Sequence, residues 1–501
     1  MKFNYIVSCN NNRIISVNEQ QYIYAKEDLK LFSSITCEEY IPNSKNIVVV
    51  GRKTWDDIPE KTKPLKNRIN IILTKNFNYK LDSKYIDTYL CYSLDHVINK
   101  ITDLSGNIKI GKVFIIGGGE IYKLAQNSDI PDDVYYVGLF NHTFTNNIEL
   151  FKKSQKRLDE YELFDIPFDY SLKRSINKRL IKSRVYNIDT GQYDIKYLNY
   201  KMEIFQNNSL INKEEYQYLN ILENVSKTGF IVDTRNGKTK SLFSDIMTYD
   251  LSTGKIPLLT TKHIYWKTIL KELLWFISGS TDNGVLQNNK VGIWNGNASK
   301  EFITKMGLPY EENDLGPVYG FQWRHFGAKY KDCKTDYTGQ GVDQLQWIIN
   351  EIKTNPTSRR LILNSWNASD IDKMVLPPCH LMIQFNVSNG FLNGQMYQRS
   401  ADLFLGVPFN IASYSFLLIM IAHLTGYKPG KFIHILGDCH IYVEHEDAVL
   451  IQLKRIPHEF PTVKIVPFKS REINSIDDFV LEDFKINDYR FYPKIHAKMI
   501  V

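Results

Sequence analysis

The chain has 501 residues, and its 62 Lys and Arg outnumber its 55 Asp and Glu, which gives a formal net charge of +7. At about 150 residues per domain, this length predicts two large domains or about three smaller ones. Apolar residues make up 43% of the sequence and charged residues 23%, which are the proportions of a globular protein and exclude a disordered, collagen-like or coiled-coil chain. The small positive excess favours polyanionic small molecules without requiring nucleic acid.

Three features predict a soluble, cytoplasmic protein. The longest apolar run, 416–422, is far shorter than the roughly 18 residues that a membrane span needs, so no membrane association is expected. The first residues contain no apolar stretch long enough for a signal peptide. The six cysteines, at 9, 37, 91, 333, 379 and 439, form no CxxC pair, which favours free thiols in a reducing compartment.

Short apolar strands alternate with polar or helical segments in the first part of the chain. We expect strands at 46–50, 68–73, 112–116 and 134–139. This alternation is typical of an α/β fold with a mostly parallel, doubly wound sheet. The strands at 46–50 and 112–116 lead into glycine and then into a helix-like segment, which exposes backbone N–H groups where a phosphate binds well. Each such junction alone is about equally compatible with a structural turn.

A polar run at 206–209 separates this part from a second part with a different pattern. We place the first domain at 1–203, a linker at 204–212 and the second domain at 213–501. In the second part, helices are expected at 267–278, 344–355 and 411–424, and extended segments at 361–364 and 381–387. This mixture predicts an α+β domain.

Cys379 is the strongest candidate nucleophile, because it follows two prolines that fix the local backbone. Most lone cysteines are buried and inert, but Arg399 and the adjacent Arg359 and Arg360 offer guanidinium groups that clamp phosphate and activate a nearby thiol. The Cys-His pairs at 379–380 and 439–440 do not predict zinc, since neighbouring residues of an extended segment face opposite ways. No metal site is expected.

Seven blocks of the second part stand in the order found in thymidylate synthase, and residues 213–501 resemble that family closely. The blocks are KELLWF at 271–276, DLGPVYG at 314–320, RRLI at 359–362, LPPCH at 376–380, QRSAD at 398–402, GVPFN at 406–410 and GDCHIY at 437–442. The family's α+β fold is therefore expected here.

This resemblance implies reductive methylation of dUMP to dTMP and a role for each matched residue. Cys379 would attack C6 of the uracil ring, so that C5 becomes a nucleophile toward the methylene group of 5,10-methylenetetrahydrofolate. Glu272 would organise proton transfer, and Tyr319 would help to remove the C5 proton. The residues expected to bind dUMP are Arg235, Arg359, Arg360, His380, Gln398, Arg399, Ser400, Asp402, Asn410, His440 and Tyr442. The residues expected to contact this folate are Trp294, Asp402 and Val501.

The resemblance also implies a homodimer formed through the synthase domain. Arg359 and Arg360 would reach the phosphate of the nucleotide bound by the other subunit, where they would join Arg399. Composite active sites are therefore expected.

The first part resembles dihydrofolate reductase, through EDLKLF at 27–32, GRKTW at 51–55, RINIIL at 68–73 and GGG at 117–119. The resemblance implies that Asp28 binds the pterin and assists its protonation, that Phe32 packs against the substrate, and that Arg68 pairs with the glutamate carboxylate of the folate. NADPH would lie across the two glycine junctions, with its contacts at Gly51, Arg52, Lys53, Thr54, Lys75, Gly117, Gly118 and Gly119. The three basic residues of this set favour NADPH over NADH.

Three departures from the reductase pattern leave an alternative open. Gln21-Tyr22-Ile23 replaces a Leu-Pro-Trp that lines the pterin pocket, Ser16 replaces a loop glycine, and Val137 stands where a threonine normally bonds the catalytic carboxylate. Each loss removes a wall or a hydrogen bond of a kind worth about 1–3 kcal/mol. In the alternative, the synthase works beside an impaired reductase-like module that binds ligand or supports the dimer.

The two halves together resemble the bifunctional dihydrofolate reductase-thymidylate synthase of protozoa and plants. In that arrangement the synthase makes dihydrofolate and the attached reductase returns it to tetrahydrofolate. A remote alternative is an RNA-binding protein that uses the basic stretch 173–184, although the sequence contains no RNA-recognition motif. Nucleic acid is therefore not expected as a partner.

Overall fold

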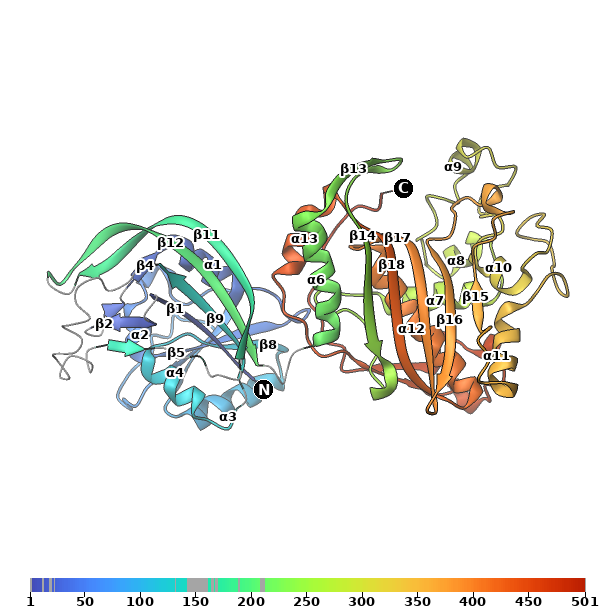
Figure 1. Ribbon diagram of the computed structural model, residues 1–501. Coiled ribbons are helices and arrows are strands. Elements are labelled where there is room, and N and C mark those ends of the chain that lie inside the picture. Colours follow the sequence, from blue (N-terminus) through green and yellow to red (C-terminus); the bar gives the residue numbers. More distant parts are fainter. Residues whose placement is uncertain are drawn as a thin grey trace. The chain divides into compact units, whose positions relative to one another are not determined.

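The chain forms two compact units, residues 1–211 and residues 212–501, and each is described by itself (Figure 1). The structure is a computed structural model that describes the chain apart from residues 1, 11–12, 18–19, 22, 131, 142–160, 164–165, 167–169, 188–189, 208–211 and 501. The backbone alone is described for residues 14, 17, 20, 161–163, 170–179, 186 and 207.

A large mixed sheet forms the first unit. Its described strands are β1 (Phe3–Asn10), β4 (Ile23–Ala25), β5 (Lys45–Gly51), β6 (Arg68–Leu73), β7 (Thr88–Cys91), β8 (Ile110–Ile115), β9 (Asp132–Phe140), β11 (Tyr170–Asn187) and β12 (Gln192–Asn207). They lie in the order β4-β11-β12-β9-β1-β8-β5-β6-β7. The strands from β9 to β7 pair in parallel, whereas β12, β11 and β4 continue the sheet with antiparallel pairs. The expected, mostly parallel sheet is confirmed, with an antiparallel edge added to it.

Helices cover both faces of this sheet because its central strands are apolar on both sides. The helices are α1 (Lys26–Thr36), α2 (Arg52–Asp57), α3 (Leu94–Ser105) and α4 (Gly119–Gln126). Val49 of β5 packs in one core cluster with Val97 of α3 and Ala125 of α4. Val50, the next residue, points to the other face and packs with Trp55 of α2. A smaller sheet joins β10 (Tyr161–Leu163), β2 (Ile14–Val17) and β3 (Gln20–Gln21).

The last strand of the first unit extends into the segment that the sequence assigns to a linker. β12 continues to Asn207, and Ile204 pairs with Tyr136 of β9. On the other side, the Asn212 side chain accepts a hydrogen bond from the N–H of Glu215 and caps α6 (Lys213–Thr228). Residues 208–211 of the expected linker lie outside the described residues.

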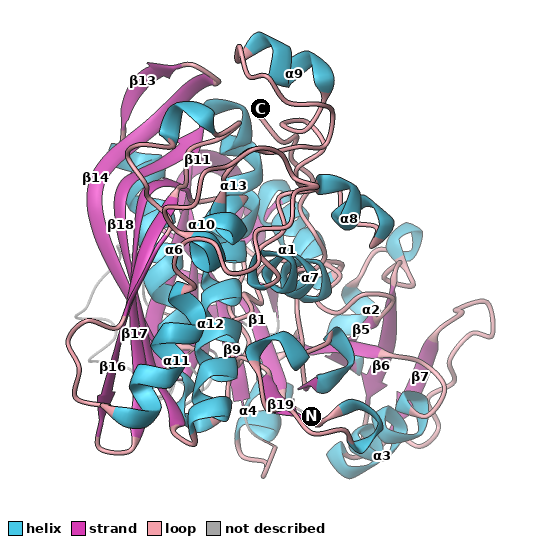
Figure 2. Cartoon of the chain, turned by 90° about the vertical axis from the view of Figure 1, so that its right-hand side faces the viewer, coloured by secondary structure: helices cyan, strands magenta, loops and turns pink. Residues whose placement is uncertain are grey.

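The second unit has a sheet in the order β13-β14-β18-β17-β16-β15. These strands are β13 (Phe230–Thr234), β14 (Gly237–Asp250), β15 (Ile362–Asn364), β16 (His380–Ser388), β17 (Phe391–Asp402) and β18 (Lys428–Tyr442). β17 and β18 are parallel, and the other neighbours are antiparallel. A two-stranded sheet joins β19 (Thr462–Ile465) and β20 (Phe484–Asn487). Figure 2 shows β14, β16, β17 and β18 as one layer with α10, α11 and α12 beside it, so the α+β expectation is confirmed.

The helices of this unit are α6, α7 (Trp266–Ile277), α8 (Asn283–Asn288), α9 (Lys300–Lys305), α10 (Tyr319–His325), α11 (Gln344–Thr354), α12 (Gly406–Thr425) and α13 (Glu446–Leu453). α12 is apolar all round because it lies in the core against β17 and β18. Among the helices in the described ranges, α12 alone has a length and composition that would also suit a membrane span, but 78% of that stretch is buried inside the unit. Its burial identifies it as a core helix.

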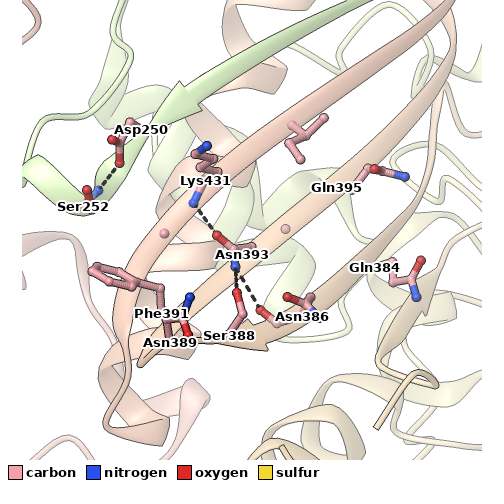
Figure 3. A pocket seen from close by; sticks show the side chains of 13 residues that line it. Asp250, Ser252, Gln384, Asn386, Ser388, Asn389, Phe391, Asn393, Gln395 and Lys431 are labelled. Carbon is pink, nitrogen blue, oxygen red and sulfur yellow. Dashed lines mark hydrogen bonds between the residues drawn. The ribbon is translucent and has the colours of Figure 1, made fainter. Parts of the chain in front are cut away.

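The face of the β13–β18 sheet that points away from α12 is exposed. Phe243 and Ile246 of β14 are 81% and 55% exposed. A polar hollow on the neighbouring strands is centred on Asn393 (Figure 3). The side-chain Nδ2 of Asn393 donates to Ser388 Oγ at 3.1 Å, and its Oδ1 accepts from the backbone N–H of Lys431 at 2.8 Å. This outer face therefore combines large apolar side chains with a recessed polar surface.

Candidate active sites

Cys379 lies immediately before β16, and backbone hydrogen bonds fix it on both sides. Its N–H donates to Tyr319 Oη at 2.7 Å, and its carbonyl accepts from the N–H of Arg399 at 2.8 Å. The Arg399 side chain donates to the carbonyls of Pro378 and Pro377 at 2.8 and 2.9 Å. The two prolines thus present carbonyl groups that hold the guanidinium in place beside the cysteine.

Opposing influences act on the pKa of the Cys379 thiol. Burial raises it, the positive charge of Arg399 and a hydrogen bond with Ser400 lower it, and the carboxylate of Asp402 adds to the increase. The net direction is upward, so the thiol keeps its proton at neutral pH in the ligand-free site. Nucleophilic attack therefore needs a proton acceptor.

Glu272 of α7 is the carboxyl group best suited to move protons in this unit. Trp294 Nε1 donates to Glu272 Oε1 at 2.7 Å and fixes the orientation of the side chain. Burial raises the pKa of Glu272 to about 7. A carboxyl group with a pKa near neutrality donates or accepts a proton readily at physiological pH.

Two residues expected to bind dUMP, His380 and Gln398, are engaged by other protein groups. The ring of His380 stacks on Tyr319 with centroids 4.2 Å apart, and its Nδ1 is 2.7 Å from Tyr414 Oη. Burial lowers the pKa of His380 to about 3, so its ring is neutral. Gln398 donates to the carbonyl of Ser400 at 2.9 Å, and its Oε1 is 2.9 Å from His434 Nε2. These contacts form a supporting layer, in which sequence reasoning missed Tyr414 and His434.

The parallel pairing of β17 and β18 brings the ends of two sequence blocks together. Ser400 pairs with Asp438, and Asp402 pairs with His440. Asp438 Oδ1 lies 2.7 Å from His440 Nδ1, and the ring of Tyr442 stands perpendicular to His440 at 5.6 Å. Sequence reasoning missed the contact between Asp438 and His440. Residues two positions apart in a strand point to the same face, which is a signal for this contact.

Five other residues were expected to bind dUMP or the folate, and the structure describes four of them. Asn410 lies in the first turns of α12 and is partly exposed. Arg235 lies in the turn between β13 and β14, with one guanidinium nitrogen 3.9 Å from Met306 Sδ. Arg359 and Arg360 are exposed, and the carbonyl of Arg359 accepts from Gln384 Nε2 at 3.4 Å at the outer face of the sheet. The structure gives this arginine pair no described contact with Cys379. Val501 lies outside the described residues.

Asp28 of α1 forms the centre of the second site, in the first unit. The carboxylate is buried, and it accepts hydrogen bonds from Ser8 Oγ and from Tyr200 Oη, both at 2.6 Å. Burial raises the pKa of Asp28, and the two hydroxyl groups oppose that increase. Neither hydroxyl group was expected from the sequence. A polar residue within the apolar strand β1 is the one weak signal for Ser8.

The expectation for Val137 needs a correction. Val137 is fully buried in the core on the far side of β9, and Gly138 faces Asp28 instead. A Cβ atom on Gly138 would lie only 2.8 Å from Asp28 Oδ1. The sequence assignment was one residue out of register, and a shift of one residue in a strand reverses the face of every side chain.

Arg68 of β6 is a buried guanidinium beside Phe32. Its Cζ lies 5.6 Å from the centre of the Phe32 ring, and its Nε donates to the carbonyl of Lys66 at 3.0 Å. A second nitrogen donates to Thr36 Oγ1 at 2.5 Å. Within the described residues no carboxylate pairs with Arg68, which suits the capture of a carboxylate from a ligand.

The two glycine junctions meet in space. The N–H of Gly51 donates to the carbonyl of Gly117 at 2.7 Å. A Cβ atom on Gly51 would lie 2.9 Å from Ile121, and one on Gly118 would lie 3.1 Å from Thr54 Oγ1. Because the backbones approach so closely, the starts of α2 and α4, at Arg52 and Gly119, lie near each other. This arrangement suits a ligand with two linked phosphates.

Three basic residues lie near these junctions. Arg52 forms an ion pair with Asp56 at 2.7 Å, and the side chains of Lys53 and Lys75 are exposed. In the altered pterin wall, Gln21 donates to the carbonyl of Ile23 at 2.9 Å, and Tyr22 lies outside the described residues. Ser16 pairs with Gln21 in the β2–β3 hairpin.

All six cysteines are free thiols. In the parts of the chain that the structure describes, no group of three or more His, Cys, Asp or Glu side chains is arranged to hold a metal ion.

Comparisons with known proteins match a family to each of the two units. The thymidylate synthase family model matches residues 216–501, and the dihydrofolate reductase family model matches residues 2–152. A putative bifunctional dihydrofolate reductase-thymidylate synthase of Oryza sativa subsp. japonica is 42% identical over 494 residues, which cover 95% of this chain and 97% of the relative. The bifunctional dihydrofolate reductase-thymidylate synthases of Zea mays and Plasmodium chabaudi are 40% and 39% identical, with 95% and 91% of this chain and 92% and 83% of the relatives covered. The chain therefore belongs to the bifunctional dihydrofolate reductase-thymidylate synthase family.

Proposed function

We propose that this bifunctional enzyme methylates dUMP to dTMP through a covalent bond from Cys379 to the nucleotide and reduces the resulting dihydrofolate at Asp28. The observation that carries the proposal is the arrangement of Cys379, held by Tyr319 and Arg399, in the same unit as a carboxyl group, Glu272, whose pKa lies near 7. The first reaction consumes 5,10-methylenetetrahydrofolate, which supplies both the methylene group and the hydride.

In the synthase reaction, Cys379 Sγ forms a bond to C6 of the uracil ring after losing its proton. Arg399 is the fixed cation beside the sulfur and binds the phosphate, together with Ser400 and Arg235. Asn410 contacts the uracil edge, while His440 and Tyr442 contact the ribose. Their side chains come from α12 and from the end of β18.

The remaining synthase residues act on the protons and the folate. Glu272 passes protons to and from the ring, because its pKa of about 7 lets it serve in both directions. Tyr319 is close enough to Cys379 to act on C5 of a bound ring, since its hydroxyl lies 2.7 Å from the cysteine N–H. Trp294, Asp402 and Val501 contact the folate.

In the reductase reaction, Asp28 binds the pterin, Phe32 packs against the substrate and Arg68 pairs with the carboxylate of the folate tail. NADPH, which supplies the hydride, fits the two glycine junctions, because Gly51 and Gly118 allow the two junctions to approach closely where a Cβ atom would meet Ile121 or Thr54. The N–H groups at the starts of α2 and α4 would bind its diphosphate, and Lys53 and Lys75 would favour its additional phosphate.

The reductase site also supports activity rather than an impaired module. The departure at the threonine position does not leave Asp28 without hydrogen-bond donors, because Ser8 and Tyr200 both donate to it at 2.6 Å.

The free thiols support our placement of the enzyme in the cytoplasm, a reducing compartment.

We propose that two copies of the chain associate through the outer face of the β13–β18 sheet. Two features give this face the character of an interface. Phe243 and Ile246 are exposed apolar side chains, and the surface is recessed around Asn393 (Figure 3). Arg359 and Arg360 are exposed beside it, where they are free to reach the site of a second copy. Each dUMP site would then contain residues from both copies.

One experiment tests both activities with two matched variants of the full chain. Given dUMP, 5,10-methylenetetrahydrofolate and NADPH, the unmodified enzyme is expected to form dTMP and to oxidise NADPH. Cys379→Ser is expected to stop both events, yet to oxidise NADPH normally when dihydrofolate is added directly. Asp28→Asn is expected to form dTMP while dihydrofolate accumulates. The proposal fails if the unmodified chain forms no dTMP or does not oxidise NADPH with dihydrofolate.

Mixing two inactive variants tests the composite sites. A heterodimer of Cys379→Ser and Arg359→Ala contains one site with both native residues, so random mixing is expected to restore about a quarter of the synthase activity. Mixing Cys379→Ser with a second inactive nucleophile variant, Cys379→Ala, is the control and restores nothing. No recovery in the first mixture would contradict the shared site.

A further inference from the structure

We propose that Ser8 and Tyr200 act together as positioning residues for Asp28 and replace the threonine hydroxyl that the reductase pattern places against this carboxylate. The inference rests on the proposed reductase function and names the groups that prepare its acid. Tyr200 belongs to β12, beyond residues 2–152 that the reductase family model matches.

Three neighbouring strands and one helix bring these groups together. β12, β9 and β1 lie side by side in the sheet, and α1 carries Asp28 (Figure 1). Ser8 of β1 is the register partner of Gly138 of β9. Ser8 Oγ donates to Asp28 Oδ2 from one side, and Tyr200 Oη donates to Asp28 Oδ1 from the other, both at 2.6 Å. Each oxygen of the carboxylate therefore has its own donor.

Gly138 makes this arrangement sterically possible. A Cβ atom there would lie 2.9 Å from Tyr200 Oη and 3.0 Å from Ser8 Oγ, in addition to its 2.8 Å approach to Asp28 Oδ1. Real Cβ atoms do not tolerate such distances without displacement of their neighbours. A threonine at position 138 and hydroxyl groups at positions 8 and 200 thus compete for the same space. The glycine and the two hydroxyl groups form a matched set.

The two donors leave the carboxylate free to bind a pterin. A carboxylate offers about four lone-pair positions, and the protein hydroxyls occupy one on each oxygen. One further position on each oxygen remains for the ring N–H and the amino group of the ligand. Because both hydroxyl groups hold the carboxylate, its plane is fixed before the ligand arrives.

The same hydroxyl groups keep Asp28 ionisable in a buried position. Burial raises the pKa of Asp28, and hydrogen bonds from Ser8 and Tyr200 lower it. Among the described residues, two titratable groups interact with Asp28: Tyr200 and Cys9 of β1. From β9, Asp28 is faced by Gly138, which has no titratable side chain. Burial raises the pKa of Cys9 to about 11 and that of Tyr200 above its usual range, so both stay neutral near pH 7. Loss of either hydroxyl group should therefore raise the pKa of Asp28 further.

The test compares Ser8→Ala and Tyr200→Phe with a matched control, Tyr135→Phe, in the full chain. Tyr135 is also a buried tyrosine whose hydroxyl donates to a carboxylate at 2.6 Å, but its partner is Asp132. Two quantities are measured across pH: kcat/KM for dihydrofolate, and the Kd of folate, which requires no turnover. Binding of NADPH, which we place in the same unit, reports that this unit folds in each variant.

Each of the two site variants is expected to move the midpoint of the Asp28-controlled pH dependence up by about one unit. Each is also expected to lower kcat/KM and folate affinity about tenfold above that midpoint. Tyr135→Phe is expected to leave the midpoint unchanged, because the hydrogen bond that it loses is to Asp132 and does not alter the proton affinity of Asp28. Gly138→Ala, which pushes both hydroxyl groups aside, is expected to shift the midpoint in the same direction.

Unchanged midpoints in both Ser8→Ala and Tyr200→Phe would overturn the inference, and so would an equal shift in Tyr135→Phe. If Tyr200→Phe loses the NADPH binding that reports folding of this unit, Ser8→Ala decides the outcome alone. An unmodified enzyme that does not oxidise NADPH with dihydrofolate would refute the reductase function, whereas the pH dependence of folate binding would still decide the role of the two hydroxyl groups.

Discussion

The two active sites hold their central residue in different ways. Cys379 and Arg399 are fixed mainly by backbone N–H and carbonyl groups of two sequence blocks, at 376–380 and 398–402. The one side-chain contribution is the Tyr319 hydroxyl, which accepts from the Cys379 N–H. Asp28 is held by side-chain hydroxyl groups, and one of them comes from a residue 172 positions away. When nearby backbone groups hold a catalytic residue, substitutions at distant positions leave it in place. When distant side chains hold it, as at Asp28, other side chains can take over as hydrogen-bond donors.

The largest effect is expected where the synthase depends on one sulfur atom. Cys379→Ser should lower dTMP formation at least about a thousandfold, because a serine hydroxyl is a far weaker nucleophile than a thiolate. The dUMP affinity should stay within about tenfold, since the phosphate and base contacts remain. Steady-state kinetics and equilibrium binding measure the two quantities, with Cys333→Ser as the control. A much larger loss of affinity would mean that the thiol serves the shape of the site.

A smaller loss is expected at the carboxyl group of the synthase. Glu272→Gln retains an oxygen to accept from Trp294 Nε1 but cannot exchange a proton, so the synthase kcat should fall about a hundredfold. Glu272 is protonated below its pKa of about 7 and ionised above it, so the pH profile of the unmodified enzyme should contain a limb with its midpoint near 7. That limb should disappear in the variant and persist in Glu301→Gln, an exposed control. A limb that persists in Glu272→Gln would assign proton transfer to another group.

In the reductase unit, Arg68→Leu should raise the KM for dihydrofolate about ten- to a hundredfold with little change in kcat. The reason is that a buried guanidinium paired with the ligand carboxylate contributes to binding in the ground state and the transition state alike. A dihydropterin without the glutamate tail is the control substrate, and its KM should not change. An equal loss with both substrates would show that Arg68 supports the fold and does not bind the tail.

The smallest effect is expected at the surface of the NADPH site. Lys75→Ala should raise the KM for NADPH about threefold and leave that for NADH unchanged, because an exposed charge in water contributes little. The effect should diminish as salt is added. Lys80→Ala is the exposed control. An equal change with NADH would contradict a role at the additional phosphate.

Helices and strands with a strong hydrophobic pattern were predicted from the sequence with nearly the observed bounds. The strand expected at 68–73 is β6, and the helices expected at 344–355 and 411–424 correspond to α11 and α12. α12 begins earlier than expected, at Gly406, because the glycine and the proline of the GVPFN block hide its first turn, where a proline is tolerated. The polar run at 206–209 begins inside β12, because Gln206 still pairs with Val134 of β9 and the strand continues to Asn207.

The sequence predicted those site residues that lie together in a contiguous motif. Arg399, Ser400 and Asp402 occupy one strand, so one motif identified them all. Ser8 and Tyr200 lie in no motif, and the register of β9 that brings Gly138 to Asp28 depends on pairing between strands distant in sequence. Long-range pairing of this kind leaves little local signal, which explains the misassignment of Val137.

The most direct measurement is mass spectrometry of the intact enzyme after incubation with 5-fluoro-dUMP and 5,10-methylenetetrahydrofolate. Fluorine at C5 cannot leave as a proton does, so the covalent complex should accumulate. The account predicts a ternary adduct whose peptide map places the added mass on Cys379, with no adduct in Cys379→Ser. An adduct on another residue, or none on the native enzyme, would contradict it.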